Sequence, residues 1–354
     1  MPLSKQDLTI WRKARAAGSG GQGIGLSDAH CGYLLALIID DLGLHDAFPL
    51  DPTPLPDFFT IDDFASPFTN CKEVYEQLAT VVPDSVTYFA CLARLLKTRL
   101  KYARILSSQP FPTLDQVGPR GLLQFGKLSS QALTAFMFWR KWFMDVDNRA
   151  GQETGYLFEP VVAAAVGGIA CSAKHSAVRS HRDSKGRQVD CLIEDDNVKD
   201  AYEFKVRVTI AASGQGRWTE ELDFPIDCRV SGYRPMLVCL DGTPNPKLQQ
   251  LVAAFQREGG EAFIGEPAWA HLYNLAGETM AKFLDRYIRE PLKELISQEA
   301  AQPLPELRAR DQGTSISIFI GTEELKIERH IEATGDDGDP LPDDVEEEMP
   351  NAPS

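Results

Sequence analysis

Two short segments, Gly186-Arg-Gln-Val-Asp-Cys-Leu-Ile193 and Tyr202-Glu-Phe-Lys-Val206, carry the most informative pattern in this sequence. Polar and apolar residues alternate in both, and the polar run Asp195-Asp-Asn-Val198 separates them. Because successive side chains of a strand point to opposite faces, this alternation is typical of β-strands. We therefore predict a β-hairpin with strands at 188–194 and 201–209.

The register of the hairpin follows from its apolar residues, which must pack on one core in both strands. A two-residue turn at Asp196-Asn197 satisfies that condition and places Asp190 directly opposite Glu203. Lys205 then lies two residues further along the same face. Two carboxylates side by side repel each other unless a cation lies between them, and an oxygen-rich pair suits Mg²⁺. Such a pair with an adjacent lysine, which can orient or deprotonate a water, is typical of a hydrolytic site for phosphodiesters.

A purely structural explanation of this pattern stays open. An antiparallel hairpin with one solvated face alternates in the same way. An Asp followed at a loose spacing by Glu-x-Lys also arises by chance, so the motif alone does not decide between the two interpretations.

The wider context adds a resemblance. With Val189 in place of a proline, Asp190…Glu203-Phe-Lys205 resembles the signature of the PD-(D/E)XK nuclease superfamily. The core of that superfamily runs helix, three antiparallel strands, helix, strand, and residues 153–241 offer these elements in that order. Within it the chain resembles the type II restriction endonucleases, and their ApaLI-like subfamily around Arg149–Gly168 and Asp190–Thr209.

The resemblance implies an α/β (α+β) fold with a restriction-endonuclease-like core, in which helices flank a central mixed sheet, and here a helical N-terminal addition. It implies that Asp190, Glu203 and the Phe204 carbonyl bind Mg²⁺, and that Lys205 is the catalytic lysine. The implied activity is sequence-specific cleavage of double-stranded DNA, by a homodimer on a palindromic site. A repair or recombination nuclease of the same fold, or a non-catalytic DNA-binding or interaction protein, remains an alternative.

Many members of the superfamily also carry an acidic residue on the first core helix. Glu159 in Gly155-Tyr-Leu-Phe-Glu159 is similar and is our candidate for a further catalytic acid. Pro160 follows it directly and leaves its local geometry open, so Glu153 is the alternative.

Basic residues flank the predicted site in sequence. Residues 94–149 contain ten Lys or Arg against three acids, and residues 171–187 contain five against one. Lys and Arg in such stretches are suited to DNA phosphates, although a solvated helix face has the same composition. A polar loop at 207–218 follows the second strand. The candidate DNA contacts are Arg182, Lys185, Arg187, Arg207, Gln215 and Arg217, for which an ordinary surface role is the alternative.

Periodicity and composition divide the rest of the chain. Helices are predicted at 27–48, 72–82, 84–106, 129–145, 153–166, 219–231, 245–257 and 276–297, and further strands at 173–181 and 235–241. As domains we expect a flexible N-terminal segment at 1–26, a mainly helical region at 27–148 with a Pro-rich arm at 49–70, a nuclease core at 149–298, a C-terminal extension with a small hairpin at 299–334, and an acidic disordered tail at 335–354.

The net charge of −15 does not exclude DNA as a partner, because the acid is segregated. Residues 40–63 hold seven acids and residues 335–354 hold eight, with no Lys or Arg in either stretch, so the remainder of the chain is neutral.

The remaining features exclude several classes of protein. The Gly-rich stretch Gly18–Gly25 does not follow a strand, so we expect a linker and no nucleotide cofactor. The longest apolar run, Val161–Ala170, is too short to cross a membrane. Seven cysteines without a C-x-x-C pair favour the reducing cytoplasm over a disulfide-rich exterior.

Overall fold

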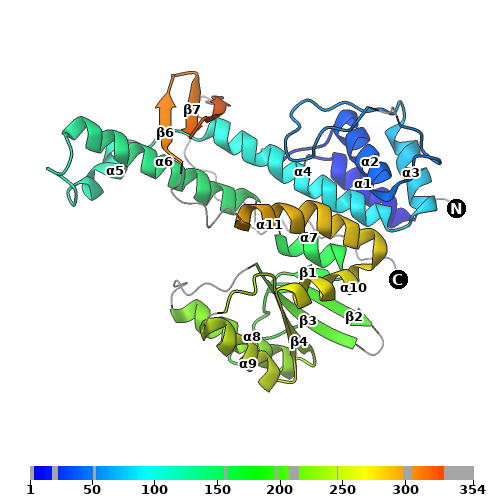
Figure 1. Cartoon of the computed structure of the whole chain (residues 1–354). Helices are drawn as coiled ribbons and strands as arrows, with labels where there is room; N and C mark the ends of the chain where they lie inside the picture. Colours follow the sequence, from blue (N-terminus) through cyan, green and yellow to red (C-terminus); the bar gives the residue numbers. More distant parts are fainter. Residues whose placement is uncertain are drawn as a thin grey trace.

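A computed structural model of the chain describes residues 4–17, 23–50, 53–154, 158–195, 198–206, 215–244, 246–297 and 305–330. Its centre is a five-stranded mixed sheet with the strand order β1-β2-β3-β4-β5 (Figure 1). The strands are β1 (Ile169–Cys171), β2 (Val189–Asp195), β3 (Val198–Lys205), β4 (Arg234–Cys239) and β5 (Glu261–Ile264). β1, β2 and β3 are antiparallel, whereas β4 and β5 run parallel to β3 and to each other.

The β2–β3 hairpin has the predicted register. Cys191 pairs with Tyr202 and Asp195 with Val198, so residues 196 and 197 connect the strands. One step beyond the Cys191–Tyr202 pair, the same register sets Asp190 opposite Glu203.

Helices cover both faces of the sheet, as the fold class predicted. α7 (Phe158–Ala165) precedes β1, α8 (Gln215–Val230) connects β3 to β4, and α9 (Pro246–Arg257) connects β4 to β5. Tyr202 and Phe204 belong to the core that α7 and α10 (Glu266–Leu284) bury, and Ala201 packs on the opposite side with Phe224 of α8. The order α7, three antiparallel strands, α8, β4 is the order expected for the core.

The N-terminal helices join the same core. They are α1 (Lys5–Arg15), α2 (Asp28–Leu42), α3 (Cys71–Val81) and α4 (Ser85–Ser108). Residues 1–26, expected from the sequence to be flexible, thus contain a folded helix whose Ile10 and Trp11 are buried. The buried Asp41 of α2 accepts hydrogen bonds from Tyr88 of α4 and from Tyr287, both at 2.7 Å.

A second unit projects beside this core (Figure 1). It consists of α5 (Leu114–Gly121), the long helix α6 (Ser130–Thr154), and a three-stranded antiparallel sheet of β6 (Leu307–Asp311), β7 (Ser315–Ile320) and β8 (Glu323–Glu328). The small hairpin predicted within residues 299–334 is confirmed as β7 and β8, which Gly321 and Thr322 connect. Trp142 of α6 is completely buried against Ile316 and Ile318 of β7.

Several predicted boundaries were wrong for identifiable reasons. The strand expected at 173–181 is a series of turns, and the strand lies earlier, at β1. The helix expected from 276 begins at Glu266, because Gly277 interrupts the apolar periodicity with a φ of 69°. It continues as a π-helical segment η1 (Asp285–Arg289) into α11 (Glu290–Ser297). The short elements α5, β5 and β6 gave no periodic signal.

The predicted polar loop at 207–218 is also corrected, because Gln215 and its three successors already form the first turn of α8. The acidic tail at 335–354 lies outside the described residues. None of the helices described combines the length and apolar character that a membrane crossing requires.

Candidate active site

Asp190 is the second residue of β2, and the neighbouring strand holds its carboxylate. The backbone N–H of Phe204 donates a hydrogen bond to Oδ2 of Asp190, with an N···O distance of 2.8 Å. In a β-strand the N–H and the carbonyl of one residue face the same neighbouring strand. The Phe204 carbonyl therefore lies on the same side of β3 as Asp190.

Glu203 and Lys205 alternate with the buried Tyr202 and Phe204, so they share the other face of β3. Nζ of Lys205 lies 2.7 Å from Oε1 of Glu203 and 3.6 Å from Oε1 of Glu221 in α8. The side chains of Glu203, Lys205 and Glu221 are 18%, 22% and 25% exposed, so solvent and a substrate can still reach them.

Glu159 lies in the first turn of α7, where Pro160 is the third helical residue. A proline fits this position because the first N–H groups of a helix have no partner within the helix. The geometry left open by the sequence is therefore an ordinary helix start. Oε2 of Glu159 is buried and has no hydrogen-bond partner among the residues that the structure describes. The side chain of the alternative acid, Glu153, lies outside the described part of the chain.

The acidic groups influence one another. Burial raises the pKa of Asp190 well above its usual range, and the charges of Glu203 and Glu159 add to the effect. Burial also raises the pKa of Glu159, with a smaller contribution from Glu203. Burial alone would lower the pKa of Lys205, but the carboxylates of Glu203 and Glu221 outweigh it and raise that pKa. Lys205 is thus held in its charged form, whereas Asp190 and Glu159 retain protons to an unusually high pH.

This donor set fits a hydrated divalent cation. Within the described ranges, no three His, Cys, Asp or Glu side chains gather closely enough to hold a metal ion by themselves. Such an ion would take ligands from Asp190, Glu203 and the Phe204 carbonyl and complete its shell with water, as Mg²⁺ commonly does. The buried oxygen of Glu159 without a partner, and the raised pKa of Asp190, indicate an excess of negative charge that a cation would relieve.

The predicted DNA contacts fall into three groups. Lys185 and Arg182 are 83% and 57% exposed, and each also pairs with a carboxylate, Lys185 with Asp183 at 3.2 Å and Arg182 with Asp223 of α8 at 2.6 Å. Arg187, in contrast, is turned inward. Arg207 lies outside the described residues, and although Gln215 and Arg217 belong to α8, their side chains are not among those described.

Arg187 attaches its segment to α8. Its guanidinium lies 3.0 Å from Oδ2 of the completely buried Asp227 and stacks over Phe224, 5.7 Å from the ring centroid. Nδ1 of His181 lies 2.6 Å from Oδ1 of the same carboxylate. Asp227 takes part in both contacts, so it helps to fix this basic segment on the helix, together with the Arg182–Asp223 ion pair.

Sequence reasoning did not find Glu221 or Asp227. The predicted helix at 219–231 contains both, but its contacts depend on how α8 packs on the sheet, which no local pattern reveals.

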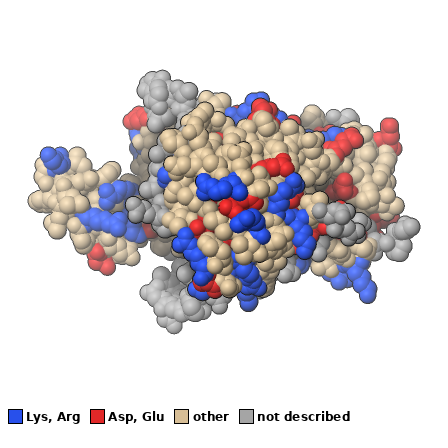
Figure 2. All heavy atoms as spheres, turned by 90° about the horizontal axis from the view of Figure 1, so that it is seen from below, with Lys and Arg blue, Asp and Glu red and all other residues tan. Residues whose placement is uncertain are grey.

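Lys and Arg side chains are also prominent on one surface of the molecule. Figure 2 views the molecule from below, over the part that contains α8 and α9, and basic side chains gather in the middle of that face. Further basic side chains lie on the projecting unit at the left of the same view, among residues that are mostly uncharged. Both surfaces are suited to a polyanion.

Comparisons with known proteins give one consistent result. A sequence model of the ApaLI-like restriction endonuclease family matches residues 61–289. The type II restriction enzyme ApaLI of Acetobacter pasteurianus is 43% identical over 334 residues, which cover 86% of this chain and 89% of that protein. No solved structure matches the chain. The matched region contains every residue of the candidate site described above.

Proposed function

This chain belongs to the family of ApaLI-like restriction endonucleases, and from that membership we propose how it cleaves DNA. It is a type II restriction endonuclease, an enzyme that hydrolyses phosphodiester bonds of double-stranded DNA at a specific sequence. We place the cleavage site at Asp190, Glu203 and Lys205, with Mg²⁺ as the cofactor. Of the three functions considered from the sequence, the repair nuclease and the non-catalytic protein receive no support from the comparisons.

The convergence of Asp190, Glu203 and Lys205 at the end of the β2–β3 pair is the observation that carries this proposal. Asp190, Glu203 and the Phe204 carbonyl would hold Mg²⁺. The bound ion supplies an acidified water and neutralises charge on the phosphate. Asp190, which the N–H of Phe204 holds in place, would contribute a ligand from β2, and Glu203 would contribute one from β3.

Lys205 has a narrower role than the sequence alone suggested. Glu203 and Glu221 raise its pKa, so at neutral pH its Nζ carries a proton and is a poor base. A cation at this position stabilises the negative charge that develops on the phosphate in the transition state. We therefore favour charge stabilisation and orientation of the attacking water over deprotonation of that water by Lys205.

Glu159 is the group best suited to accept a proton. Its pKa is raised by burial, which brings it closer to neutrality, and its Oε2 has no hydrogen-bond partner to compete for that proton. A general base is most effective when its pKa lies near the working pH. We propose that Glu159 helps to position the attacking water and receives its proton.

A second copy of the chain completes the proposed enzyme. A homodimer with twofold symmetry would cut both strands of a palindromic site, one in each active site. We propose that it acts in the cytoplasm without a nucleotide cofactor. The seven free cysteines, six of which are buried, accord with a reducing compartment.

Digestion of a closed circular plasmid tests the proposed reaction. With Mg²⁺ we expect discrete fragments whose sequenced ends share one short palindrome, and with EDTA no cleavage. Progressive trimming of linear DNA, or fragments in EDTA, would contradict the proposal. Analytical ultracentrifugation of the same preparation tests the dimer.

A further inference from the structure

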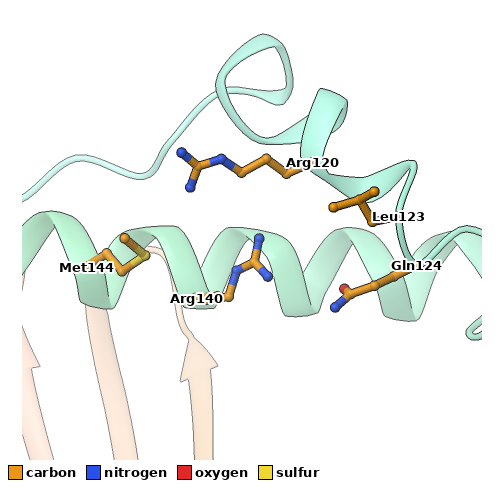
Figure 3. Close-up of a pocket in the computed structure, with 5 residues that line it drawn as sticks. All are labelled: Arg120, Leu123, Gln124, Arg140 and Met144. Atoms are coloured by element: carbon orange, nitrogen blue, oxygen red, sulfur yellow. The ribbon is translucent and has the colours of Figure 1, made fainter. Parts of the chain in front are cut away.

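The projecting unit contains a pocket that the cleavage site does not explain. α5 and α6 are joined by residues 122–129 and pack against each other through Val117, Leu133 and Met137. Between them lies an open pocket of about 420 Å³. Its lining residues are Arg120, Leu123, Gln124, Arg140 and Met144 (Figure 3).

Two guanidinium groups share this pocket. Figure 3 shows Arg120 of α5 and Arg140 of α6 extending into the space between the two helices. Within the described parts of the chain, neither forms an ion pair with a carboxylate. Arg140 contacts only neighbours on its own helix, Sδ of Met137 at 3.4 Å and the ring of Phe136 at 5.5 Å.

The charge around the pocket identifies the kind of ligand. Residues 116–144 contain four Lys or Arg and no Asp or Glu. Arginine stays charged at any physiological pH, so two of them in one concavity repel each other until an anion lies between them. The planar guanidinium matches the oxygens of a phosphate group. The pocket is therefore suited to the phosphodiester backbone of a nucleic acid.

The tip of the same unit is apolar. Leu122, Leu123 and Phe125 are 77%, 88% and 72% exposed. Adjacent exposed apolar side chains of this size are typical of a surface that binds another molecule. Proteins that grip DNA through its minor groove combine arginines on the backbone with apolar side chains pressed between base steps. Leu123 belongs to both the pocket and the tip, which joins the two features.

We propose that the α5–α6 unit is a second DNA-binding element, separate from the cleavage site. Arg120 and Arg140 bind a backbone phosphate, and Leu122, Leu123 and Phe125 enter the adjacent groove. This inference rests on the proposed function of the chain as a DNA endonuclease.

Packing contacts hold the α5–α6 unit in a fixed position, as DNA binding requires. α6 is continuous from Ser130 near the tip to Thr154, and β7 packs on its middle through Trp142. The guanidinium of Arg329, after β8, stacks over the ring of Phe111, 4.4 Å from its centroid. This contact joins the end of the small sheet to the segment that precedes α5. A phosphate held by Arg140 would thus keep a fixed position relative to the small sheet of β6, β7 and β8.

A second copy of the chain fits the tip less well. A symmetric contact between two such units would bring Arg120 and Arg140 of both copies together, and within the described residues neither arginine has an acid as a partner. DNA supplies the missing negative charge.

The salt dependence of DNA binding tests the arginines. Binding of the full chain to a fluorescein-labelled duplex is measured in EDTA over a series of KCl concentrations. The double variant Arg120→Ala/Arg140→Ala should lose affinity for the duplex by about tenfold or more. The slope of log K against log salt should fall in magnitude by about 1, because the contact to the one phosphate that the two arginines share is lost. The charge-matched control Lys5→Ala/Arg12→Ala, on α1 at the opposite end of the molecule, should leave the slope unchanged (Figure 1).

The apolar tip has a different expected signature. The double variant Leu123→Ser/Phe125→Ser should lower affinity several-fold without changing the salt slope, because no phosphate contact is removed. Loss of self-association in this variant, with unchanged DNA affinity, would make the tip a contact between copies and overturn the inference.

The arginine result also separates this inference from the proposed function. If the wild-type chain cleaves plasmid DNA while Arg120→Ala/Arg140→Ala retains the wild-type slope and affinity, only the inference fails. If the wild-type chain neither binds nor cleaves duplex DNA, the proposed function fails first.

Discussion

The backbone N–H of Phe204 in β3 donates a hydrogen bond of 2.8 Å to the carboxylate of Asp190 in β2. This bond connects two strands and joins the residue most clearly predicted as a metal ligand to the residue whose carbonyl is predicted beside it. The same carboxylate is largely buried, and its pKa is well above the usual range. Its charge is therefore unfavourable in the metal-free protein, and the first two predictions follow from that.

We predict that Asp190→Asn stabilises the metal-free fold. The native state binds the Asp190 proton more tightly than the unfolded chain does. The contribution of Asp190 to the free energy of unfolding is therefore greatest below the unfolded pKa of about 3.9, and it is lost as pH rises through the folded pKa. Asparagine retains an oxygen that accepts from Phe204 and carries no charge. Urea unfolding at neutral pH in EDTA should give a higher midpoint for the variant than for the wild type. A lower midpoint would contradict the buried environment of this carboxylate.

Binding of divalent cations should weaken as pH is lowered. The ligand Asp190 must lose a proton that its raised pKa retains, and the charges of Glu203 and Glu159 contribute to that rise, so metal competes with protons at a higher pH than at an ordinary carboxylate. Calorimetric titration with Ca²⁺, which avoids cleavage, should show affinity rising with pH up to neutrality and proton release on binding. Affinity that is constant from pH 5 to 8 would exclude Asp190 from the site.

Lys205→Ala should destabilise the protein at neutral pH. The pKa of Lys205 is raised, so its stabilising contribution is present below the unfolded pKa of about 10.4 and is lost only as pH rises through the folded value. Removal leaves Glu203 and Glu221 without the cation between them, at a cost of about 1–3 kcal/mol. Chemical denaturation measures the loss, and Lys205→Arg should recover much of it. A neutral effect of both substitutions would mean that solvent screens this contact fully.

Glu159 and Glu153 can be separated by a matched pair of substitutions. Glu159→Gln should slow cleavage by about 10²-fold if it accepts a proton in the reaction. Glu153→Gln, six residues earlier in the chain, should cleave like the wild type. Single-turnover rates of plasmid cleavage measure both. The reverse result would assign the accessory acid to Glu153.

Arg187 and Lys185 should differ although they are two residues apart. Arg187→Ala leaves the buried Asp227 without its guanidinium partner and should lower the free energy of unfolding by about 3 kcal/mol. The side chain of Lys185 is 83% exposed, so Lys185→Ala should leave the free energy of unfolding unchanged and weaken DNA binding. Thermal unfolding and duplex binding of both variants check this division between a structural and a DNA-facing residue. Equal stability of the two variants would contradict it.

The sequence predicted the centre of the site better than its surroundings. The register of β2 and β3, which sets Asp190 opposite Glu203 when it is extended by one step, could be predicted because apolar parity and a two-residue connection allow no other. Glu221 could not, because it approaches Lys205 only after α8 has folded back over the sheet. The strand expected at 173–181 failed because short alternations also occur in turns, here held by Ser172 and Ser176. α6 was predicted as the helix at 129–145, but α5 was missed because it is short and contains Pro119.

Cleavage of plasmid DNA by four variants tests the central claim most directly. Asp190→Asn, Glu203→Gln and Lys205→Ala remove the three groups that converge at β2 and β3, and Asp46→Asn is a control at an exposed acid remote from them in the chain. In Mg²⁺ we predict loss of at least about 10²-fold in rate for each of the first three, with the fold retained by circular dichroism, and wild-type cleavage by the control. Wild-type cleavage by Asp190→Asn and Lys205→Ala would show that the enzyme cuts DNA elsewhere.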